Sequence, residues 1–332
     1  MKVFVTGATG FVGSHLTQWF EAQGHEVWGL CRSLKKREAM GTVGHGVEGS
    51  LSTHVDRPNS WLDRLPSDLD AVVHVAGLTQ TFRASEFFHV NETGTRRLVD
   101  DLRQRHPQLR FTLVSSLAAA GPGRTPTERA EPRPISRYGE SKLRGEQVLV
   151  EAAPDSWDLA IVRPPMVIGP RDPGMLELFK VVRSRVMLMP GLLGRWKIYS
   201  YVGVSDLAEL LGRCTVQTLP RRPTFHYAAH PTPVTFFQLM NAIRRTMGIR
   251  IAAPLPLPGP AMWATAGLGK LLNQCGLPQW IALTPDKVRE ASQAGWVCPT
   301  QPSIEELGME YKDDLSSILA RTYDDYRQRG WI

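Results

Sequence analysis

The stretch Thr-Gly-Ala-Thr-Gly-Phe-Val-Gly at residues 6–13 decides the fold of this chain. It ends a β-rich run that begins at the amino terminus, and it leads into a helix-forming stretch at residues 14–23. Gly7 allows a sharp turn from strand to helix, Gly10 lets backbone approach a pyrophosphate, and Gly13 lets the helix pack close to the strand. The first amides of the helix then face the phosphates, where the helix dipole favours negative charge. Glycine triplets also occur in ordinary tight turns, but strand, loop and helix together predict a dinucleotide-binding unit.

Short β-rich runs alternate with helical stretches through the first half of the chain. Four such runs follow the first, at residues 26–32, 70–76, 110–116 and 158–164. Helices are expected at residues 89–105 and 138–153. Continuous apolar strands separated by helices indicate a parallel sheet covered on both faces. We therefore predict an α/β fold, a doubly wound parallel sheet of the Rossmann type, with its ligand at the carboxyl ends of the strands.

The second half of the chain is broken by prolines and glycines. Helices are expected there at residues 234–247 and 315–329. We expect residues 1–165 to form the dinucleotide-binding domain and residues 166–332 to form a smaller, mostly helical substrate-binding part. Some segments of this second part are expected to return to the body of the first.

Composition and charge are those of an ordinary globular protein. The chain of 332 residues has a formal charge of +7, but its lysines and arginines are spread along the sequence, which argues against a nucleic-acid partner. Its four cysteines lack metal-ligand spacing, so we expect no metal site and a reducing compartment. No charged start followed by an apolar run precedes the first strand, so a cleaved signal peptide is not expected and a cytoplasmic location is.

The segment at residues 260–283 is apolar, but glycines, Lys270, Asn273 and Pro278 interrupt it too often for a membrane span. The favoured interpretation is an amphipathic helix packed on its own domain. Peripheral contact with a membrane surface, or a role as cover over an apolar ligand, stays open.

Tyr138 and Lys142 lie four residues apart among strong helix formers, so both side chains project from one helical face. An unperturbed phenol has a pKa of about 10, and a nearby ammonium together with a positively charged nicotinamide lowers this pKa by favouring phenolate. Tyr138 would then exchange a proton with a substrate oxygen near neutral pH. A tyrosine four residues before a lysine is common on helix surfaces, so the pair alone does not define a site.

Ser115 and Ser116 end the run at residues 110–116, at the edge of the sheet where ligands of open α/β folds bind. A hydroxyl at this edge can hold a reacting oxygen. Alternatively, the serines merely end the strand and cap the next turn. The glycine loop, the serine pair and the Tyr138–Lys142 pair occur in the order that favours catalysis.

These stretches together resemble the short-chain dehydrogenase/reductase superfamily in its extended group, the NAD-dependent epimerase/dehydratase family, over nearly the whole chain. The similar stretches are TGATGFVG, VVHVAG, HVNETGTRRLV, VSSLAAAG, YGESK, RPPMVIGP, YVGVSDLAEL and RQRGW. The resemblance implies hydride transfer at C4 of a nicotinamide, with Ser116, Tyr138 and Lys142 as catalytic residues. Asn91 is similar to the helix asparagine that props such sites, although it is equally typical of a helix kink or cap. Dimers are common in this family, so a homodimer or a monomer is expected.

The register of the serine pair bears on the reaction. Sugar dehydratases of this group carry Ser-Thr-Asp-Glu-Val-Tyr-Gly at the equivalent strand end, and Ser-Ser-Leu-Ala-Ala-Ala-Gly has the same length. Ser116 then matches their catalytic threonine, while Leu117 and Ala118 replace their acidic pair. Without these carboxylates no acid and base are available to expel water, so a dehydratase is not expected.

A second departure bears on the substrate. Nucleotide-sugar epimerases of the group usually have an asparagine that helps to hold the phosphates in an RPxN-like strand end, whereas this chain has Arg163, Pro164, Pro165 and Met166. The RPPMVIGP form is similar to the 3β-hydroxysteroid dehydrogenase and dihydroflavonol reductase branches, whose substrates are large and mostly apolar.

An apolar ligand also fits the composition of the second half. Methionines adapt to irregular ligands, although such residues are as often ordinary core. Residues 187–194 are expected to form a loop bordering the ligand, and Arg195 and Lys197 are expected to be solvated charges unless they meet an acidic ligand group. The candidate lining residues are Met166, Met175, Met187, Met189, Leu192, Leu193, Trp196 and Met262.

The end of the second strand predicts the cofactor. NAD-preferring units place an acidic residue there on the ribose hydroxyls, but this chain has Arg32, whose guanidinium can pair with a 2′-phosphate and stack on adenine. We therefore predict NADP rather than NAD. Ser50 stands where the family often has an aspartate that reads adenine. The residues expected to bind the cofactor are Gly7, Thr9, Gly10, Phe11, Val12, Gly13, Arg32, Ser50, Leu51, Val75, Ala76, Gly77, Asn91, Tyr138, Lys142, Pro165 and Val167.

The sequence thus predicts an NADP-dependent oxidoreductase that interconverts a secondary alcohol and a ketone on a bulky apolar substrate, such as a sterol, terpenoid or flavonoid-like molecule. A nucleotide-sugar 4-ketoreductase or epimerase is the first alternative. A protein that binds NADPH without turnover is the second.

Overall fold

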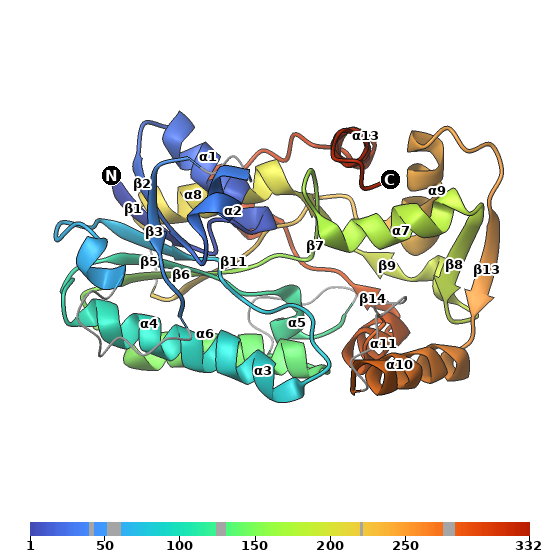
Figure 1. Ribbon diagram of the computed structural model, residues 1–332, viewed down its shortest axis with the longest axis horizontal. Helices are drawn as coiled ribbons and strands as arrows, with labels where there is room; N and C mark the ends of the chain where they lie inside the picture. The colour runs from blue at the N-terminus through green and yellow to red at the C-terminus, as the bar shows by residue number, and fades with distance from the viewer. Residues whose placement is uncertain (40–42, 52–60, 124–130, 220–221, 275–282) are drawn as a thin grey trace.

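The computed structural model describes residues 1–39, 43–51, 61–123, 131–219, 222–274 and 283–332. A seven-stranded parallel sheet forms the body, with strand order β11-β6-β5-β4-β1-β2-β3 (Figure 1). The strand order reverses next to β1, as in a doubly wound sheet, so the predicted α/β fold is confirmed. The strands are β1 (Lys2–Thr6), β2 (Glu26–Cys31), β3 (His45–Glu48), β4 (Ala71–His74), β5 (Arg110–Val114), β6 (Asp158–Arg163) and β11 (Thr224–Tyr227).

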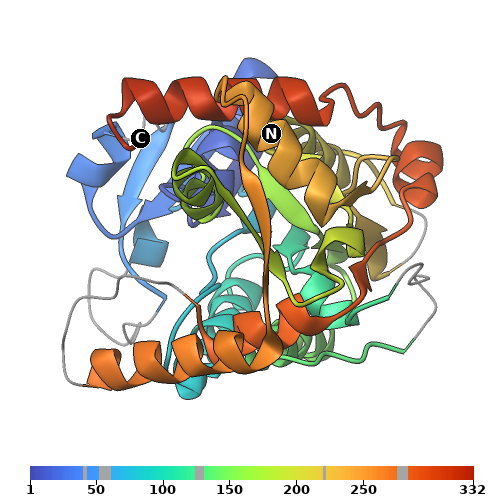
Figure 2. The ribbon, with the colours of Figure 1, turned by 90° about the vertical axis from the view of Figure 1, so that its right-hand side faces the viewer.

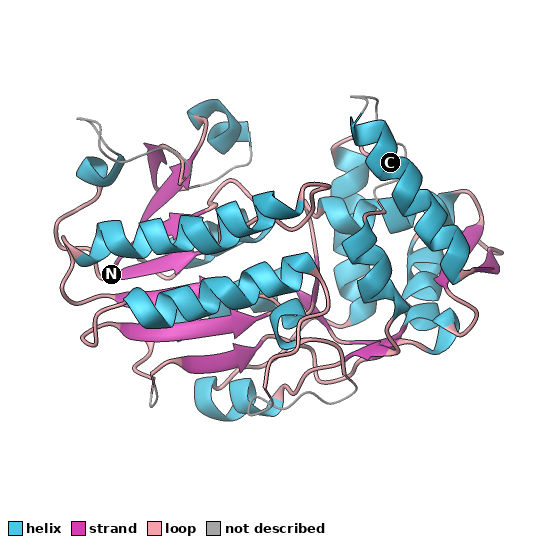
Figure 3. Cartoon of the chain, turned by 90° about the horizontal axis from the view of Figure 1, so that it is seen from below, coloured by secondary structure: helices cyan, strands magenta, loops and turns pink. Residues whose placement is uncertain are grey.

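Helices cover both faces of this sheet (Figures 1 and 3). One face carries α1 (Phe11–Ala22), α2 (Leu34–Ala39) and α8 (Val204–Val216). The other face carries α3 (Ala84–Phe88), α4 (Gly94–Arg103) and α6 (Arg137–Ala152). The short α5 (Leu117–Ala120) follows β5 directly. The helix expected at residues 89–105 is instead a π-helical turn at His89–Thr93 followed by α4, and α1 begins three residues before the expected helix because Gly10 serves as its N-cap.

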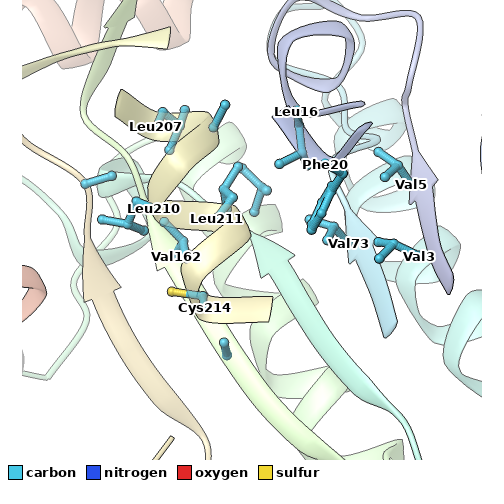
Figure 4. Close-up of a cluster of buried hydrophobic side chains, with 14 of the residues drawn as sticks. Val3, Val5, Leu16, Phe20, Val73, Val162, Leu207, Leu210, Leu211 and Cys214 are labelled. Carbon is cyan, nitrogen blue, oxygen red and sulfur yellow. The ribbon is translucent and has the colours of Figure 1, made fainter. Parts of the chain in front are cut away.

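The alternation of side chains along β1 divides the core into two layers. Val3 and Val5 point into the layer beneath α1 and α8, where they belong to the same cluster as Phe20 and Leu211 (Figure 4). Phe4, between them, belongs to the opposite layer, beneath α4 and α6. Successive strand residues face opposite sides of a sheet, so a continuous apolar run supplies both layers.

The second half of the chain builds a further core and also returns to the sheet. β11 pairs with β6, and α8 packs beside α1, so both complete the body formed by the first half. The separate core lies among α7, α9 and α13 and includes Phe179, Leu239 and Tyr326. The helices of this core are α7 (Pro173–Arg183), α9 (Phe236–Thr246) and α13 (Leu315–Gln328). Helices α10 (Gly259–Gln274) and α11 (Pro285–Ser292) pack on each other, and α12 (Gln301–Leu307) packs on α8 and β11.

Within the described ranges, this part also contains three small sheets. β7 pairs with β10, β8 pairs with β13, and β9 lies between β12 and β14. Their bounds are β7 (Met166–Ile168), β8 (Val186–Pro190), β9 (Ile198–Tyr199), β10 (Tyr201–Gly203), β12 (Val234–Thr235), β13 (Ala253–Leu257) and β14 (Gly295–Trp296). The expectation of a bordering loop at residues 187–194 was therefore wrong for its first half, because β8 makes a parallel ladder with β13.

Candidate active site

The loop between β1 and α1 leaves no room for a side chain at Gly7 or Gly13. Gly7 has a φ of +68°, and a Cβ there would lie 2.8 Å from the backbone nitrogen of Ala76. A Cβ on Gly13 would overlap the carbonyl oxygen of Gly7. Helix α1 starts immediately after this loop, and its first turn contains no acidic residue. The loop and the helix start therefore fit the pyrophosphate of a dinucleotide, which needs close backbone approach and free amides.

The other residues predicted to bind the cofactor follow the strands at the same edge of the sheet. Because neighbouring strands are parallel in register, their carboxyl ends meet at one edge. Arg32 follows β2 directly and is exposed. The remaining predicted positions are Ser50 and Leu51 after β3, Val75, Ala76 and Gly77 after β4, and Pro165 and Val167 after β6.

The structure brings Lys142 to this edge of the sheet. Its side chain is buried, and Nζ donates a hydrogen bond of 2.7 Å to the carbonyl oxygen of Val114, the last residue of β5. Burial lowers the pKa of the Lys142 ammonium to about 8, against an opposing contribution from the negative charge of Glu146. The helix that positions Lys142 is capped by Ser136, whose Oγ accepts a hydrogen bond of 3.0 Å from the backbone N–H of Gly139.

The two serines have different surroundings. Ser116 is the N-cap of α5, accepting a hydrogen bond of 3.1 Å from the backbone N–H of Ala118, and its hydroxyl is also hydrogen-bonded to the side chain of Tyr138. Ser115 is buried and donates its hydroxyl to Glu146 Oε1. Ser116, and not Ser115, is therefore the serine that contacts Tyr138. Ser116 caps the following helix and contacts Tyr138 at the same time.

The electrostatics of Tyr138 differ from the sequence-based expectation. Burial raises the pKa of the Tyr138 phenol above its usual value. The hydrogen bond from Ser116 and the positive charge of Lys287 oppose this rise, with the Lys287 ammonium 5.7 Å from the ring centroid. The expected lowering of the phenol pKa by Lys142 is therefore wrong for the protein's own groups, because desolvation dominates and the cation that acts on Tyr138 is Lys287.

Helix α11, far along the chain, holds the start of the helix that carries Tyr138. Asp286 Oδ2 accepts a hydrogen bond of 3.0 Å from the backbone N–H of Tyr138, and Ser136 Oγ donates one of 2.8 Å to Glu290. Lys287 pairs with Glu290 at 2.9 Å. Sequence reasoning missed these residues because they lie about 150 positions from Tyr138 and no local pattern marks them.

A buried ion pair behind the site was also missed. Arg163 Nη2 lies 2.6 Å from Glu146 Oε2, and both side chains are about 5% exposed. A second bond of 2.9 Å joins Arg163 Nε to Glu146 Oε1, and Arg163 Nη1 donates to the hydroxyl of Tyr227 at 3.3 Å. The spacing of Glu146 could have indicated its place beside the site, because Glu146 follows Lys142 by one helical turn on the same face.

Asn91 connects two parts of the site. It lies in the π-helical turn His89–Thr93, and its Oδ1 accepts a hydrogen bond of 2.8 Å from the backbone N–H of Leu78. Its Nδ2 donates to Ser141 Oγ on α6 at 2.9 Å. A Cβ on Gly77 would lie 3.1 Å from Asn91 Oδ1 and 3.4 Å from Lys142 Nζ. Asn91 therefore connects the loop after β4 to the helix of Tyr138. The residue lies in the irregular turn of its own helix and also bridges two parts of the site, so both interpretations of Asn91 apply.

Most of the methionines expected to line a ligand belong to the protein's own core. Met175, Met187 and Met189 are 3 to 4% exposed in the cluster that includes Phe179, and Met262 is buried against Val288. The alternative interpretation, that these methionines belong to the ordinary core, was therefore correct for these four residues.

The charges next to this core also differ from expectation. Lys197 is buried, with Nζ donating to the carbonyl oxygen of Ala291, so it is not the solvated charge that was expected.

Three other candidate lining residues lie on the surface. Leu192, Leu193 and Trp196 are 64 to 77% exposed.

Among the residues that the structure describes, no three His, Cys, Asp or Glu side chains are grouped as metal ligands. No helix within the described ranges has the length and apolarity needed to cross a membrane. Cys275 and the end of the segment at residues 260–283 lie outside the described residues.

The chain belongs to the NAD dependent epimerase/dehydratase family, whose model matches residues 3–210. It is therefore an NAD(P)-dependent enzyme of a family of reductases and epimerases, the extended group that the sequence resembles.

Its relatives include reductases of apolar molecules. A ceramide reductase of Caulobacter vibrioides is 28% identical and aligns with 99% of this chain and 96% of its own. A 4-hydroxy-2-methyl-3-oxo-4-farnesyl-3,4-dihydroquinoline-1-oxide ketoreductase of Stigmatella aurantiaca is 27% identical over 84% of this chain and 83% of its own. A solved UDP-glucuronic acid 4-epimerase of Bacillus cereus in complex with NAD has the same fold, with a TM-score of 0.77, 18% identity and coverage of 99% and 97%. The similarity to the 3β-hydroxysteroid dehydrogenase branch stays a prediction.

Proposed function

We propose that this protein is an NADPH-dependent reductase that interconverts a ketone and a secondary alcohol on a long-chain, lipid-like substrate. One observation carries the proposal. At the carboxyl edge of the sheet, Ser116 is hydrogen-bonded to Tyr138, and Tyr138 precedes the buried Lys142 by one helical turn.

The chemistry follows from these three side chains. When bound, the nicotinamide supplies the hydride. The Ser116 hydroxyl holds the substrate oxygen, and Tyr138 donates its phenolic proton to that oxygen during reduction. Because burial raises the pKa of Tyr138, the phenol is protonated and ready to act as an acid at neutral pH. The Lys142 ammonium would hold the ribose hydroxyls of the bound dinucleotide through charge-assisted hydrogen bonds.

Arg32 supports NADPH as the partner. It is exposed immediately after β2, at the position where an acidic residue would receive the ribose hydroxyls of NAD. A guanidinium can accept a 2′-phosphate in bidentate fashion, whereas no carboxylate occupies this strand end.

The substrate class is supported by the site and by the relatives. Leu117 and Ala118 are buried apolar residues at positions where sugar dehydratases carry acids, so this site offers no acid–base pair for water elimination. Ceramide and a farnesyl-bearing quinoline, named for two relatives, share a long hydrocarbon chain beside polar groups. We therefore propose a ketone on a long-chain amphiphile.

The test is turnover with a long-chain ketone. The full chain is mixed with NADPH and a 3-keto sphingoid lipid in detergent, and oxidation of NADPH is followed by absorbance. We expect turnover in the wild type and a loss of about a thousandfold in kcat for Tyr138→Phe, because general acid catalysis contributes about 10²–10⁴. Tyr323→Phe, on the exterior helix α13, is the matched control and should retain its rate. Full turnover in Tyr138→Phe would overturn the assignment.

A nucleotide-sugar or lipid-linked-sugar epimerase is the second candidate. It is favoured by a relative from Escherichia coli O157:H7, an N-acetyl-alpha-D-glucosaminyl-diphospho-ditrans,octacis-undecaprenol 4-epimerase, which is 27% identical over 82% of this chain. A rise in melting temperature with a UDP-sugar, combined with no turnover of the long-chain ketone, would select this candidate.

A further inference from the structure

Helix α10 (Gly259–Gln274) has apolar side chains on opposite faces. Its inner face packs Met262 and Ala266 against α11. On its outer face, Trp263, Leu268 and Leu271 are 45%, 57% and 55% exposed. A surface helix of a water-soluble protein normally carries polar residues on its outer side. Packing among the described residues therefore does not account for the outer face of α10.

A neighbouring turn extends this exposed apolar face. Leu192 and Leu193 follow β8 and are 77% and 72% exposed. The backbone N–H of Gly191 donates a hydrogen bond of 2.9 Å to the carbonyl oxygen of Leu257, two residues before α10 begins. The turn is therefore hydrogen-bonded to the strand β13 that leads into α10, at the end of the molecule that faces the viewer in Figure 2.

Exposed leucines on the adjoining ribbon continue the same surface. Leu188 of β8 is the register partner of Leu255 of β13, and both are exposed. We call the set Leu192, Leu193, Leu255, Trp263, Leu268 and Leu271 the apolar end surface.

Exposed cations adjoin this surface. Lys270 is exposed on α10, and the exposed Arg195 lies 5.0 Å from the ring centroid of Trp196. On α11, the acids Asp286 and Glu290 are each paired with a cation, at 2.9 Å.

We propose that the apolar end surface docks on a bilayer containing anionic phospholipid. Exposed Trp and Leu side chains on a helix, flanked by Lys and Arg, are the features that hold a protein in the interface of a membrane. Helix α10 has 16 residues, so it lies along the surface and does not cross it. The inference stands independently of the substrate proposed above.

Helix α11 contacts both α10, which carries part of the apolar end surface, and the helix of the candidate active site. Helix α10 packs on α11 (Figure 1). Asp286 of α11 accepts a hydrogen bond from the backbone N–H of Tyr138. A bilayer bound at α10 would therefore lie next to α11, the helix that positions Tyr138. This arrangement suits a substrate that reaches the site from the membrane.

Flotation with lipid vesicles tests the proposal. The full chain is mixed with vesicles of phosphatidylcholine alone or with added phosphatidylglycerol, and the bound fraction is measured after density-gradient centrifugation. We expect binding to the phosphatidylglycerol vesicles that decreases with added salt. Leu268→Ser combined with Leu271→Ser should lower the bound fraction about tenfold, because binding depends on buried apolar area.

Val150→Ser is the matched control. Val150 is 40% exposed on α6, at the carboxyl-terminal end of that helix and away from Tyr138. This variant should bind vesicles like the wild type. Absence of binding to both vesicle types, or an equal loss in Val150→Ser, would overturn the proposal. So would a lipid-free dimer in sedimentation analysis that the Leu268/Leu271 double variant abolishes, because a second copy would then be the partner of this surface.

Discussion

Glu146 links the candidate catalytic lysine to the buried framework behind it. It follows Lys142 by one turn of α6, pairs with Arg163 and accepts a hydrogen bond from Ser115. Its negative charge also raises the pKa of Lys142 against the stronger effect of burial. One carboxylate therefore both neutralises a buried guanidinium and adjusts the charge state of the lysine.

The proposed role of Lys142 predicts that activity depends on pH. Burial places the pKa of Lys142 at about 8, so its ammonium is present below that pH and is lost as the pH rises. We expect kcat/KM with NADPH to fall through about pH 8, because this parameter reports groups of the free enzyme. A Lys142→Arg variant keeps its charge and should not show this fall, measured as initial rate against pH. A fall at the same pH in both proteins would assign it to another group.

Glu146→Gln should change both stability and the pH profile. It leaves the buried Arg163 without its counter-ion, a loss of about 3 kcal/mol in the free energy of unfolding. It also removes the charge that raises the pKa of Lys142, so the decline in kcat/KM should begin at lower pH than in the wild type. Denaturant unfolding and the pH–rate profile measure the two effects.

Glu151→Gln provides the control for this substitution. Glu151 lies on the same helix in a surface pair with Arg96, at 2.7 Å and with 70% of its side chain exposed. Its loss should change stability by less than about 1 kcal/mol and leave the pH profile unchanged. A profile in Glu146→Gln identical to the wild type would limit Glu146 to a structural role.

Arg32 determines cofactor choice in the proposed function. Arg32→Asp should lower the affinity for NADPH by about tenfold to a hundredfold, because a charge-assisted bond is replaced by like-charge repulsion, and should favour NADH. Fluorescence titration with both cofactors measures the change. Arg103→Asp, on the exterior of α4, is the control. An unchanged NADPH preference in Arg32→Asp would show that another group binds the 2′-phosphate.

At the scale of elements, the turn from β1 to α1 is set by close contact. A Cβ on Gly13 overlaps the carbonyl oxygen of Gly7, so Gly13→Ala must push α1 away from the strand. We expect a loss of about 1–3 kcal/mol in stability and weaker NADPH binding, measured by denaturant unfolding and titration. Gly267→Ala is the control, because a Cβ there meets nothing within 4 Å on α10, and it should preserve or increase stability.

Another relation between elements is the docking of α11 on α6. The Asp286 carboxylate bonds the first turn of α6, and Lys287 lies over the Tyr138 ring. A segment of the second half therefore sets the position and the charge environment of a tyrosine in the first half. This explains why the cation that acts most directly on the phenol is not the lysine four residues along its own helix.

At the scale of the whole molecule, the sheet edge joins segments from the entire chain, so a bound dinucleotide should stabilise the native state as a unit. Saturation at about a hundred times Kd adds about 2.7 kcal/mol to the free energy of unfolding. We expect a rise in melting temperature with NADPH that exceeds the rise with NADH, measured by differential scanning fluorimetry. No shift with either cofactor would contradict dinucleotide binding at this edge.

The sequence by itself determined the features that depend on local geometry. The glycine spacing at Gly7, Gly10 and Gly13 specifies the strand–turn–helix unit, because only residues without Cβ fit the contacts found there. Apolar runs at strand length specify the parallel sheet, and the four-residue interval between Tyr138 and Lys142 places both on one helical face. The expected helix there, at residues 138–153, agrees with α6 to within one residue at each end.

Tertiary structure decided the rest. Segments brought together by packing decided the pairing of Glu146 with Arg163, the docking of α11 and the core role of Met175 and Met189. The exposed face of α10 also depends on tertiary structure. The sequence of an apolar helix does not show whether both of its sides are packed or one of them stays exposed. Burial and desolvation arise from the whole fold, so neither the direction of the Tyr138 pKa nor the open surface could be read from residue spacing.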